Sequence, residues 1–314
     1  MNYWKLTLAA AVASSVLVAC NDTEEDTSTT TENVDGAAYP LTVTDVIGQE
    51  VTIEEQPQRI ISMIPSNTEI LFELGLDEEI VAVTDIENYP EEALTKETIG
   101  SMEFDFEKII ALEPDIVFSH ESAMLVSEAG LDQLRSAGID VYVVEDADDF
   151  EETYETIEEI AQITNTTDKA QEIIADMKAH VADIESKLEG VEPKRVFLEN
   201  SDVPDIYTAG SNTFLHTMLE MVEAENVAAS KEGWYPISTE EIITQNPDVI
   251  IVSYSYVPDI LTTLPQRPGF DTIAAVQNNE VVQVDENLIA RQGPRLAQGL
   301  EELAKAVHPE AFGE

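Results

Sequence analysis

Between residues 168 and 190 the apolar positions recur at steps of three and four, with charged side chains between them, and this pattern predicts one long amphipathic helix. The apolar positions are Ala170, Ile173, Ile174, Met177, Val181, Ile184 and Leu188. Thr167 or Asp168 is expected to cap the start of the helix, and Gly190 to end it. At 1.5 Å per residue the helix is about 33 Å long. A rod of this length does not fit within one compact βα unit, so we expect it to bridge two lobes.

On both sides of this helix, short apolar runs alternate with helical patterns, which is typical of α/β units with parallel sheets. Helices are expected over residues 68–74, ending at Gly75, and over residues 149–163. The predicted fold class is α/β, with two Rossmann-like lobes that each contain a central, mostly parallel sheet and are joined by the one long helix. Strands are expected at residues 41–45, 51–53, 59–64, 80–84, 115–119 and 141–145, the first two as a hairpin. The expected boundaries are 39–166 for the N lobe, 167–191 for the bridging helix and 192–314 for the C lobe.

A repeated segment supports the division into two lobes. Residues 106–117 (FEKIIALEPDIV) recur at an offset of 133 as residues 239–250 (TEEIITQNPDVI). Each copy is expected to contain a helix with a glutamate in its first turn, Glu107 or Glu240, then a Pro-Asp stop and a buried strand. The two lobes are therefore built on one plan.

The first 38 residues have the character of a targeting segment and a tether. An apolar run from Leu6 to Leu17 is too short to cross a bilayer of about 30 Å as a helix. Leu17-Val18-Ala19-Cys20 resembles a bacterial lipobox, so residues 1–19 are expected to be a signal peptide and Cys20 the lipidated first residue. Residues 20–38 are acidic and nearly free of apolar side chains, which predicts a flexible tether. With one cysteine, no internal disulfide can form.

Charge and motifs exclude several functions. The chain has 15 basic and 64 acidic residues, a net charge of −49, so nearly every face would repel the phosphates of nucleic acids. No nucleophile elbow, phosphate-binding loop, His-Glu-x-x-His pair or dinucleotide fingerprint occurs, so no catalytic residue or enzymatic activity is predicted. The histidines His120, His180, His216 and His308 lack ligand spacing, and no metal site is predicted; His120 is a weak candidate for an axial metal ligand.

The most specific pieces of the sequence carry a family resemblance. Pro65-Ser66-Asn67-Thr68-Glu69, the two repeated Glu…Pro-Asp segments and Gly293-Pro294-Arg295-Leu296 resemble the substrate-binding lipoproteins of ABC importers, in the vitamin B12 and ferric-siderophore (Fe/B12 periplasmic-binding) group. The resemblance covers residues 59–312. It implies a class III periplasmic-binding-protein fold, with the ligand in the cleft between the lobes and a bridging helix that limits closure.

The resemblance also implies location and partners. The protein is expected to be a monomer on the extracytoplasmic face of the cell membrane, held there through its lipid anchor only and needing no cofactor. Its partners would be an ABC transporter permease and, through it, the ATPase. In this family Glu107 and Glu240 would enter arginine pockets on the paired permease subunits.

The ligand would be a cobalt corrinoid or an iron chelate. Tyr207, Trp234 and Arg291 match positions that are aromatic or basic in B12-binding members, whereas Ile86 and Ser101 stand where Tyr and Trp would be expected. Pockets form at the carboxyl ends of parallel strands, so residues that follow the predicted strands are further candidates for ligand contacts. Corrinoid ranks first, ferric siderophore second and haem third; a lipid-anchored hydrolase or adhesin is the alternative from another class. The predicted ligand contacts are Ser66, Asn67, Tyr89, His120, Tyr207, Trp234, Tyr254 and Arg291, with Ser119, Tyr256 and Arg267 as further candidates, while Arg295 is assigned a structural role.

Overall fold

The computed structural model describes residues 39–313, which belong to one compact unit. The predicted signal peptide, lipidated Cys20 and tether lie outside the described residues. Within residues 39–313, no helix has the length and apolar character needed to cross a bilayer.

The N lobe contains the predicted hairpin and a five-stranded sheet in the order β5-β4-β3-β6-β7, in which every neighbouring pair is parallel. The hairpin pairs β1 with β2 in antiparallel register. Helix α1 begins at Pro65, before the expected residue 68, because proline suits the first turn of a helix. The elements are β1 (Leu41–Thr44), β2 (Glu50–Ile53), β3 (Ile60–Ser62), α1 (Pro65–Glu73), β4 (Ile80–Val83), β5 (Glu97–Thr98), α2 (Phe106–Ala111), β6 (Ile116–His120), α3 (Met124–Ser136), β7 (Asp140–Val144) and α4 (Phe150–Thr164).

The C lobe contains a four-stranded parallel sheet in the order β10-β8-β12-β13 and a separate two-stranded antiparallel ribbon of β9 and β11. The parallel sheets of both lobes confirm the predicted α/β class. The elements are β8 (Lys194–Glu199), β9 (Tyr207–Ala209), α6 (Phe214–Met221), β10 (Ala224–Asn226), β11 (Trp234–Pro236), α7 (Thr239–Gln245), β12 (Val249–Val252), α8 (Ile260–Thr263), α9 (Ala274–Asn278), β13 (Val281–Gln283), α10 (Glu286–Ile289) and α11 (Leu296–Val307).

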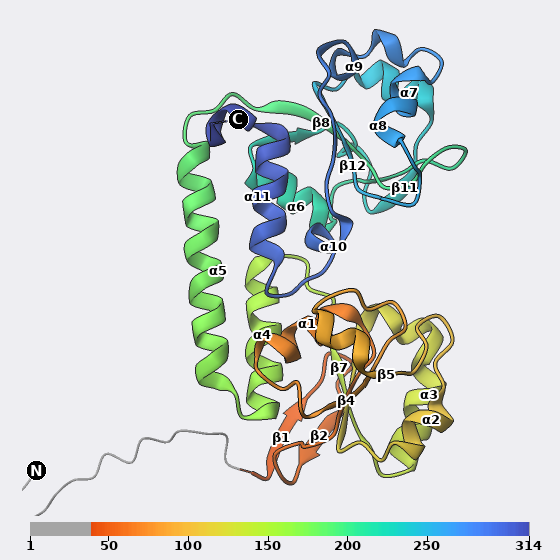
Figure 1. Cartoon of the computed structure of the whole chain (residues 1–314), viewed down its shortest axis with the longest axis vertical. Helices are drawn as coiled ribbons and strands as arrows, with labels where there is room; N and C mark the ends of the chain where they lie inside the picture. The colour runs from red at the N-terminus through yellow and green to blue at the C-terminus, as the bar shows by residue number, and fades with distance from the viewer. Residues whose placement is uncertain (1–38, 314) are drawn as a thin grey trace, which may run out of the picture. The chain divides into compact units, whose positions relative to one another are not determined.

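The predicted long helix is α5 (Thr167–Leu188), which packs against α4 of the N lobe and α11 of the C lobe (Figure 1). Its apolar stripe joins one hydrophobic core that continues from one lobe into the other. The expected cap is wrong: the N-cap is Thr166, which makes no side-chain capping bond and whose hydroxyl lies 3.0 Å from that of Thr164. Gly190 follows the helix with a left-handed φ of 81°.

The two copies of the sequence repeat also make equivalent hydrogen bonds at the ends of their helices. Asp105 and Ser238, also 133 apart, cap α2 and α7 through their side chains. Arg59 donates to the last carbonyls of α2, and Arg195 donates to Gln245 O and Asn246 O at the end of α7. Cationic groups suit the negative end of a helix dipole, so one arginine stabilises each copy in the same way.

Candidate functional site

A cavity of about 420 Å³ lies between the two lobes. On the N lobe it is lined by Ile64 after β3, His120 at the end of β6 and residues 146–148 after β7. On the C lobe it is lined by residues 212–215 at the start of α6, by Trp234 and by the connection between α10 and α11. Its volume falls in the range of small-molecule sites.

The strand order of the N lobe explains why the cavity opens here. In the order β5-β4-β3-β6-β7 the chain runs outward from β3 in one direction and from β6 in the other, so these neighbours form the topological switch point. Loops leaving the carboxyl ends of two such strands diverge and leave a crevice between them. Ile64 follows β3 and His120 ends β6. Both line the cavity, as expected if pockets form at the carboxyl ends of parallel strands.

His120 is a neutral, nearly buried imidazole at the cavity wall. Its exposed fraction is 3%, and burial lowers its pKa to about 4, although the charge of Glu121 acts in the opposite direction. The backbone N–H of Ser122 donates to His120 Nδ1 at 3.3 Å, and the Ser122 hydroxyl lies 2.8 Å from the same atom. An Nδ1 that accepts a hydrogen bond carries no proton, so the ring proton belongs on Nε2. This arrangement counts against an axial metal ligand, which would need Nε2 free of its proton.

Trp234 and Tyr207 lie on one face of the ribbon formed by β9 and β11. Trp234 pairs with Ala209 and Pro236 pairs with Tyr207, so the two aromatic residues are diagonal neighbours on the same face. Trp234 is 50% exposed and Tyr207 is 42% exposed. Trp234 lines the cavity, and Tyr207 extends the same aromatic surface along the ribbon.

Two cavity residues that sequence reasoning missed are Asp146 and Asp148. They lie two and four residues after the carboxyl end of β7, so the rule that selected His120, that pockets form at the carboxyl ends of parallel strands, could have found them. Burial, with Glu121 and Asp148 adding to it, raises the pKa of Asp146. Asn212 and Thr213, before α6, were missed as well, because the short strand β9 that precedes them has no clear pattern of its own.

The predicted contacts Ser66 and Asn67 lie in the first turn of α1, where they are buried. The Asn67 amide donates to Ser119 O at 2.9 Å, while the hydroxyls of Ser66 and Ser119 have no hydrogen-bond partner within the described part of the chain. Gly293 of the C lobe lies close to Ser66 O, at 3.6 Å from where its Cβ would stand. Ser66 and Asn67 are thus buried near the contact between the lobes, and neither lines the cavity.

A buried ion-pair cluster of Glu69, Arg291 and Arg295, here called the Glu69 cluster, joins the lobes. Glu69 lies on α1 and is 3% exposed. Arg291 Nη1 donates to Glu69 Oε1 at 2.7 Å and to Asn88 Oδ1 at 2.7 Å. Arg295 Nε and Nη2 donate to Glu69 Oε2 and Oε1 at 2.9 and 2.6 Å. The charge of Arg291, a predicted ligand contact, is therefore satisfied by the N lobe.

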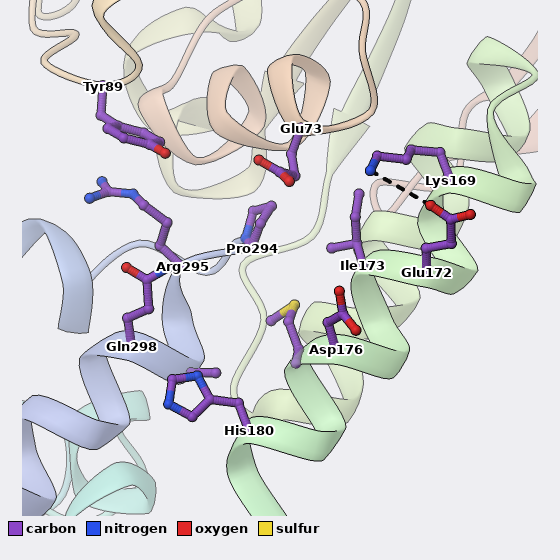
Figure 2. A pocket seen from close by; sticks show the side chains of 12 residues that line it. Glu73, Tyr89, Lys169, Glu172, Ile173, Asp176, His180, Pro294, Arg295 and Gln298 are labelled. Atoms are coloured by element: carbon purple, nitrogen blue, oxygen red, sulfur yellow. Dashed lines mark ion pairs between the residues drawn. The ribbon is translucent and has the colours of Figure 1, made fainter.

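A second, smaller hollow of about 210 Å³ lies beside this cluster, between α1, α5 and the start of α11. Figure 2 shows the side chains that line it. Arg295 lies over the ring of Tyr89, with 3.9 Å between the guanidinium carbon and the ring centroid. Lys169, Asp176 and His180 reach the hollow from α5 (Figure 2). Tyr89 is the single predicted ligand contact that lines it. The cavity between the lobes, which contains His120 and Trp234 and lies at the strand ends, is the better candidate site.

Tyr254 and Arg267 belong to a buried network in the C lobe. Tyr254 is 1% exposed, and its hydroxyl donates to Glu199 Oε1 at 2.6 Å. Arg267 donates to both oxygens of Glu199 at 2.7 and 2.8 Å and to Asp202 at 2.6 Å. Tyr254 stacks on the exposed ring of Tyr256, with 4.9 Å between the centroids. Neither Tyr254 nor Arg267 lines the cavity in the described structure.

Glu107 and Glu240 occupy equivalent places in the first turns of α2 and α7. Both are exposed, and within residues 39–313 neither forms an ion pair. Glu241, the neighbour of Glu240, is instead paired with Lys231 at 3.1 Å. One unpaired carboxylate on each lobe is thus available to a partner.

Comparisons with known proteins match the chain to periplasmic binding proteins. Residues 60–288 match the family described as periplasmic binding protein. The chain is 38% identical to the ABC transporter substrate-binding lipoprotein YvrC of Bacillus subtilis, over 99% of this chain and 98% of that protein. It is 27% identical to a cobalamin-binding protein of Halobacterium salinarum, over 86% of this chain and 75% of that protein.

Among solved structures, the chain resembles a periplasmic solute-binding protein of Staphylococcus epidermidis, named as a possible iron-binding protein. The identity is 36%, the TM-score is 0.74, and the match covers 81% of this chain and all of that chain. The relatives that are named for a solute differ in it: cobalamin for the Halobacterium salinarum protein and iron for the Staphylococcus epidermidis protein.

Proposed function

Because the chain belongs to the periplasmic binding protein family, it is a solute-binding protein of an ABC importer, and we propose that its solute is a corrinoid captured between the two lobes. The family carries solutes and does not transform them, so the protein is not an enzyme, and a lipid-anchored hydrolase is no longer a candidate.

The aromatic face of the β9–β11 ribbon is the observation that carries the corrinoid proposal. Trp234 and Tyr207 project from one side of this ribbon, and each leaves about half of its side chain open. A corrin macrocycle presents broad apolar faces that stack on such rings, and its fringe of amides needs hydrogen-bond partners. Ser122, Asn212 and Gln292 offer such partners around the cavity.

Visible absorption tests the proposal directly, because corrinoids, haem and ferric siderophores are all coloured. Purified protein titrated with cyanocobalamin is expected to retain it on gel filtration at one equivalent. Trp234→Ala should weaken binding about 5- to 150-fold, as expected for loss of an aromatic anchor worth 1–3 kcal/mol. Leu261→Ala, an exposed apolar residue on α8 away from the cavity, is the control and should bind as wild type. Retention of haem or a ferric siderophore, with no binding of cyanocobalamin, would replace the corrinoid with that ligand.

We also propose that Glu107 and Glu240 dock the protein on its permease. The two helices repeat the same geometry, one on each lobe, so they can present one carboxylate to each half of a two-fold symmetric channel. Glutamate–arginine contacts at an interface typically cost 2 kcal/mol or more when one partner is removed. The double variant Glu107→Ala, Glu240→Ala should keep its ligand affinity and lose stimulation of the transporter ATPase in reconstituted vesicles.

Glu241→Ala is the matched control for docking. It removes a carboxylate from the same helix turn, but one that lies about 100° around the helix from Glu240 and is already paired with Lys231. It should stimulate the ATPase as wild type does. Full stimulation by the double variant would remove the docking proposal, and loss of its ligand binding would assign the two glutamates to the ligand site.

The proposed location is the extracytoplasmic face of the cell membrane, where a monomer would be held by lipid on Cys20. The sequence Leu17-Val18-Ala19-Cys20 supports the anchor. An acidic tether after Cys20 would keep the folded unit in solution near the permease, because like charges extend a chain.

A further inference from the structure

The wall of the interlobe cavity carries negative charge and no cation. Asp146 and Asp148 line it from the N lobe, and within the described residues no lysine or arginine lines it. A third carboxylate stands next to them, since the backbone N–H of Asp146 donates to Glu121 Oε2 at 3.3 Å. The histidine in the wall, His120, is neutral. A ligand in this cavity therefore meets carboxylates with no positive side chain between them.

The two arginines that were candidates for the ligand already form ion pairs with buried carboxylates. Arg267 is bonded to both oxygens of Glu199, whose exposed fraction is 0%, and to Asp202. Arg291 is bonded to Glu69, which is shared with Arg295. Moving Arg267 to an anionic ligand would leave the buried carboxylate of Glu199 without a counter-charge, a change that costs several kilocalories per mole in proteins. Moving Arg291 would break its hydrogen bonds to Glu69 and Asn88, although Arg295 would still pair with Glu69. Neither arginine is free to offset ligand charge.

His120 is a neutral hydrogen-bond donor among the polar residues that line the cavity. His120 Nε2 carries the ring proton, because Nδ1 accepts from Ser122. Within the described structure the imidazole ring of His120 bonds only to Ser122, and the residue lines the cavity. A neutral N–H suits an amide or hydroxamate oxygen on the ligand, and it adds no positive charge.

We propose that the cavity selects chelates of zero or positive net charge that carry amide-type oxygens, and that the carboxylates of Asp146 and Asp148 exclude anionic chelates. This inference rests on the proposed function, because it assumes that the interlobe cavity is where the solute binds. It narrows the ligand to neutral or cationic corrinoids and hydroxamate siderophores, and it rejects catecholate siderophores and molecules with free carboxylates.

Ligand pairs that differ in net charge test the inference. The first pair is cyanocobalamin and a monocarboxylic acid of cyanocobalamin, in which one side-chain amide is replaced by a carboxylate. The second pair is ferrioxamine B, which is cationic, and its anionic N-succinyl derivative. For the pair that binds, the anionic member is expected to bind at least about tenfold more weakly at low salt, and the difference should shrink as salt screens the charges.

Variants assign the effect to the two aspartates. Asp146→Asn with Asp148→Asn keeps side-chain size and removes both charges, so the difference within a pair should fall to about twofold or less. Asp271→Asn, an exposed aspartate outside the cavity, is the control and should keep the wild-type difference. Equal affinity for both members of the pair in the wild-type protein would overturn the inference, as would a difference that the double variant leaves intact.

The two pairs also separate this inference from the corrinoid proposal. Binding of ferrioxamine B over its succinyl derivative, with no binding of either corrinoid, would overturn the corrinoid ligand and support the charge selection. Binding of both corrinoids with equal affinity would support the ligand and overturn the charge selection. Binding of a trianionic ferric catecholate, with neither pair bound, would overturn both.

Discussion

Replacing Glu69 with glutamine should destabilise the protein strongly, because this one carboxylate joins the lobes. It accepts three hydrogen bonds of 2.6 to 2.9 Å from Arg291 and Arg295, and it is 3% exposed. Glu69→Gln keeps the size of the side chain and one oxygen, but it leaves two guanidinium groups without their counter-charge. The contacts that remain are those of Arg291 with Asn88 and of Arg295 with the ring of Tyr89.

The magnitude follows from the burial of the partners. Breaking a buried ion pair by removing one partner costs about 3–5 kcal/mol. The side chains of Arg291 and Arg295 are 13% and 15% exposed, so water reaches both in part and the lower end of that range applies. A loss of about 3 kcal/mol corresponds to a fall in Tm of about 6–12 °C for a protein of this size.

Urea unfolding and thermal unfolding, both followed by circular dichroism, measure the change. Glu73→Gln is the matched control, since this exposed glutamate lies one turn further along the same helix and forms no ion pair within residues 39–313. It should stay within about 0.5 kcal/mol of wild type. Combining Glu69→Gln with Arg295→Gln should cost less than the sum of the single changes, because the two residues share one interaction.

A Glu69→Gln variant that unfolds at the wild-type midpoint would show that Glu69 does not stabilise the contact between the lobes. Additive effects of Glu69→Gln and Arg295→Gln would refute the coupling between them, because additivity means that the two side chains do not interact in solution. A loss of stability equal in Glu69→Gln and Glu73→Gln would assign the effect to helix α1 and not to the contact between the lobes.

Three further predictions concern other parts of the chain. Burial holds the pKa of His120 in the folded state at about 4, below its ordinary 6.5, so the unfolded state binds more protons between these pH values. As the pH falls from 6.5 to 4, the free energy of unfolding should therefore decrease by up to about 3 kcal/mol because of this residue. In His120→Gln the urea midpoint should depend less on pH in that window than in wild type, and parallel plots of midpoint against pH would contradict this. Gly210→Ala would place its Cβ 2.0 Å from Lys231 O, so it should displace the strand that carries Trp234 and weaken ligand binding. The Cβ of Gly293→Ala would meet no atom closer than 3.6 Å, so this variant should keep the thermal stability of wild type. Cys20→Ala should abolish lipidation, and a wild-type protein without diacylglycerol at Cys20, by mass spectrometry, would disprove the anchor.

Local sequence patterns predict the long helix, the repeated helix–strand units and part of the cavity wall. The spacing of apolar side chains over residues 168–190 predicts α5 because a helix repeats every 3.6 residues and its core-facing stripe must be continuous. The repeat of residues 106–117 at residues 239–250 predicts two equivalent helix–strand units for the same reason, since each copy contains its own periodicity and its own stop. His120 could be predicted because it is the last residue of a parallel strand, whereas Trp234, the first residue of an antiparallel strand, was indicated by the family resemblance.

Contacts between distant residues were decided only by the tertiary structure. The sequence assigned Arg291 to the ligand and Arg295 to a structural role, whereas both bind Glu69, which lies more than 200 positions earlier. Tyr254 likewise reads as a strand-end residue, yet its hydroxyl is bonded to Glu199 in the core of the C lobe. In a chain with 64 acidic residues, no local pattern distinguishes the carboxylate that is buried against an arginine from those that face water. That choice depends on which side chains the packing of two lobes brings within about 3 Å, and periodicity along the chain contains no information about it.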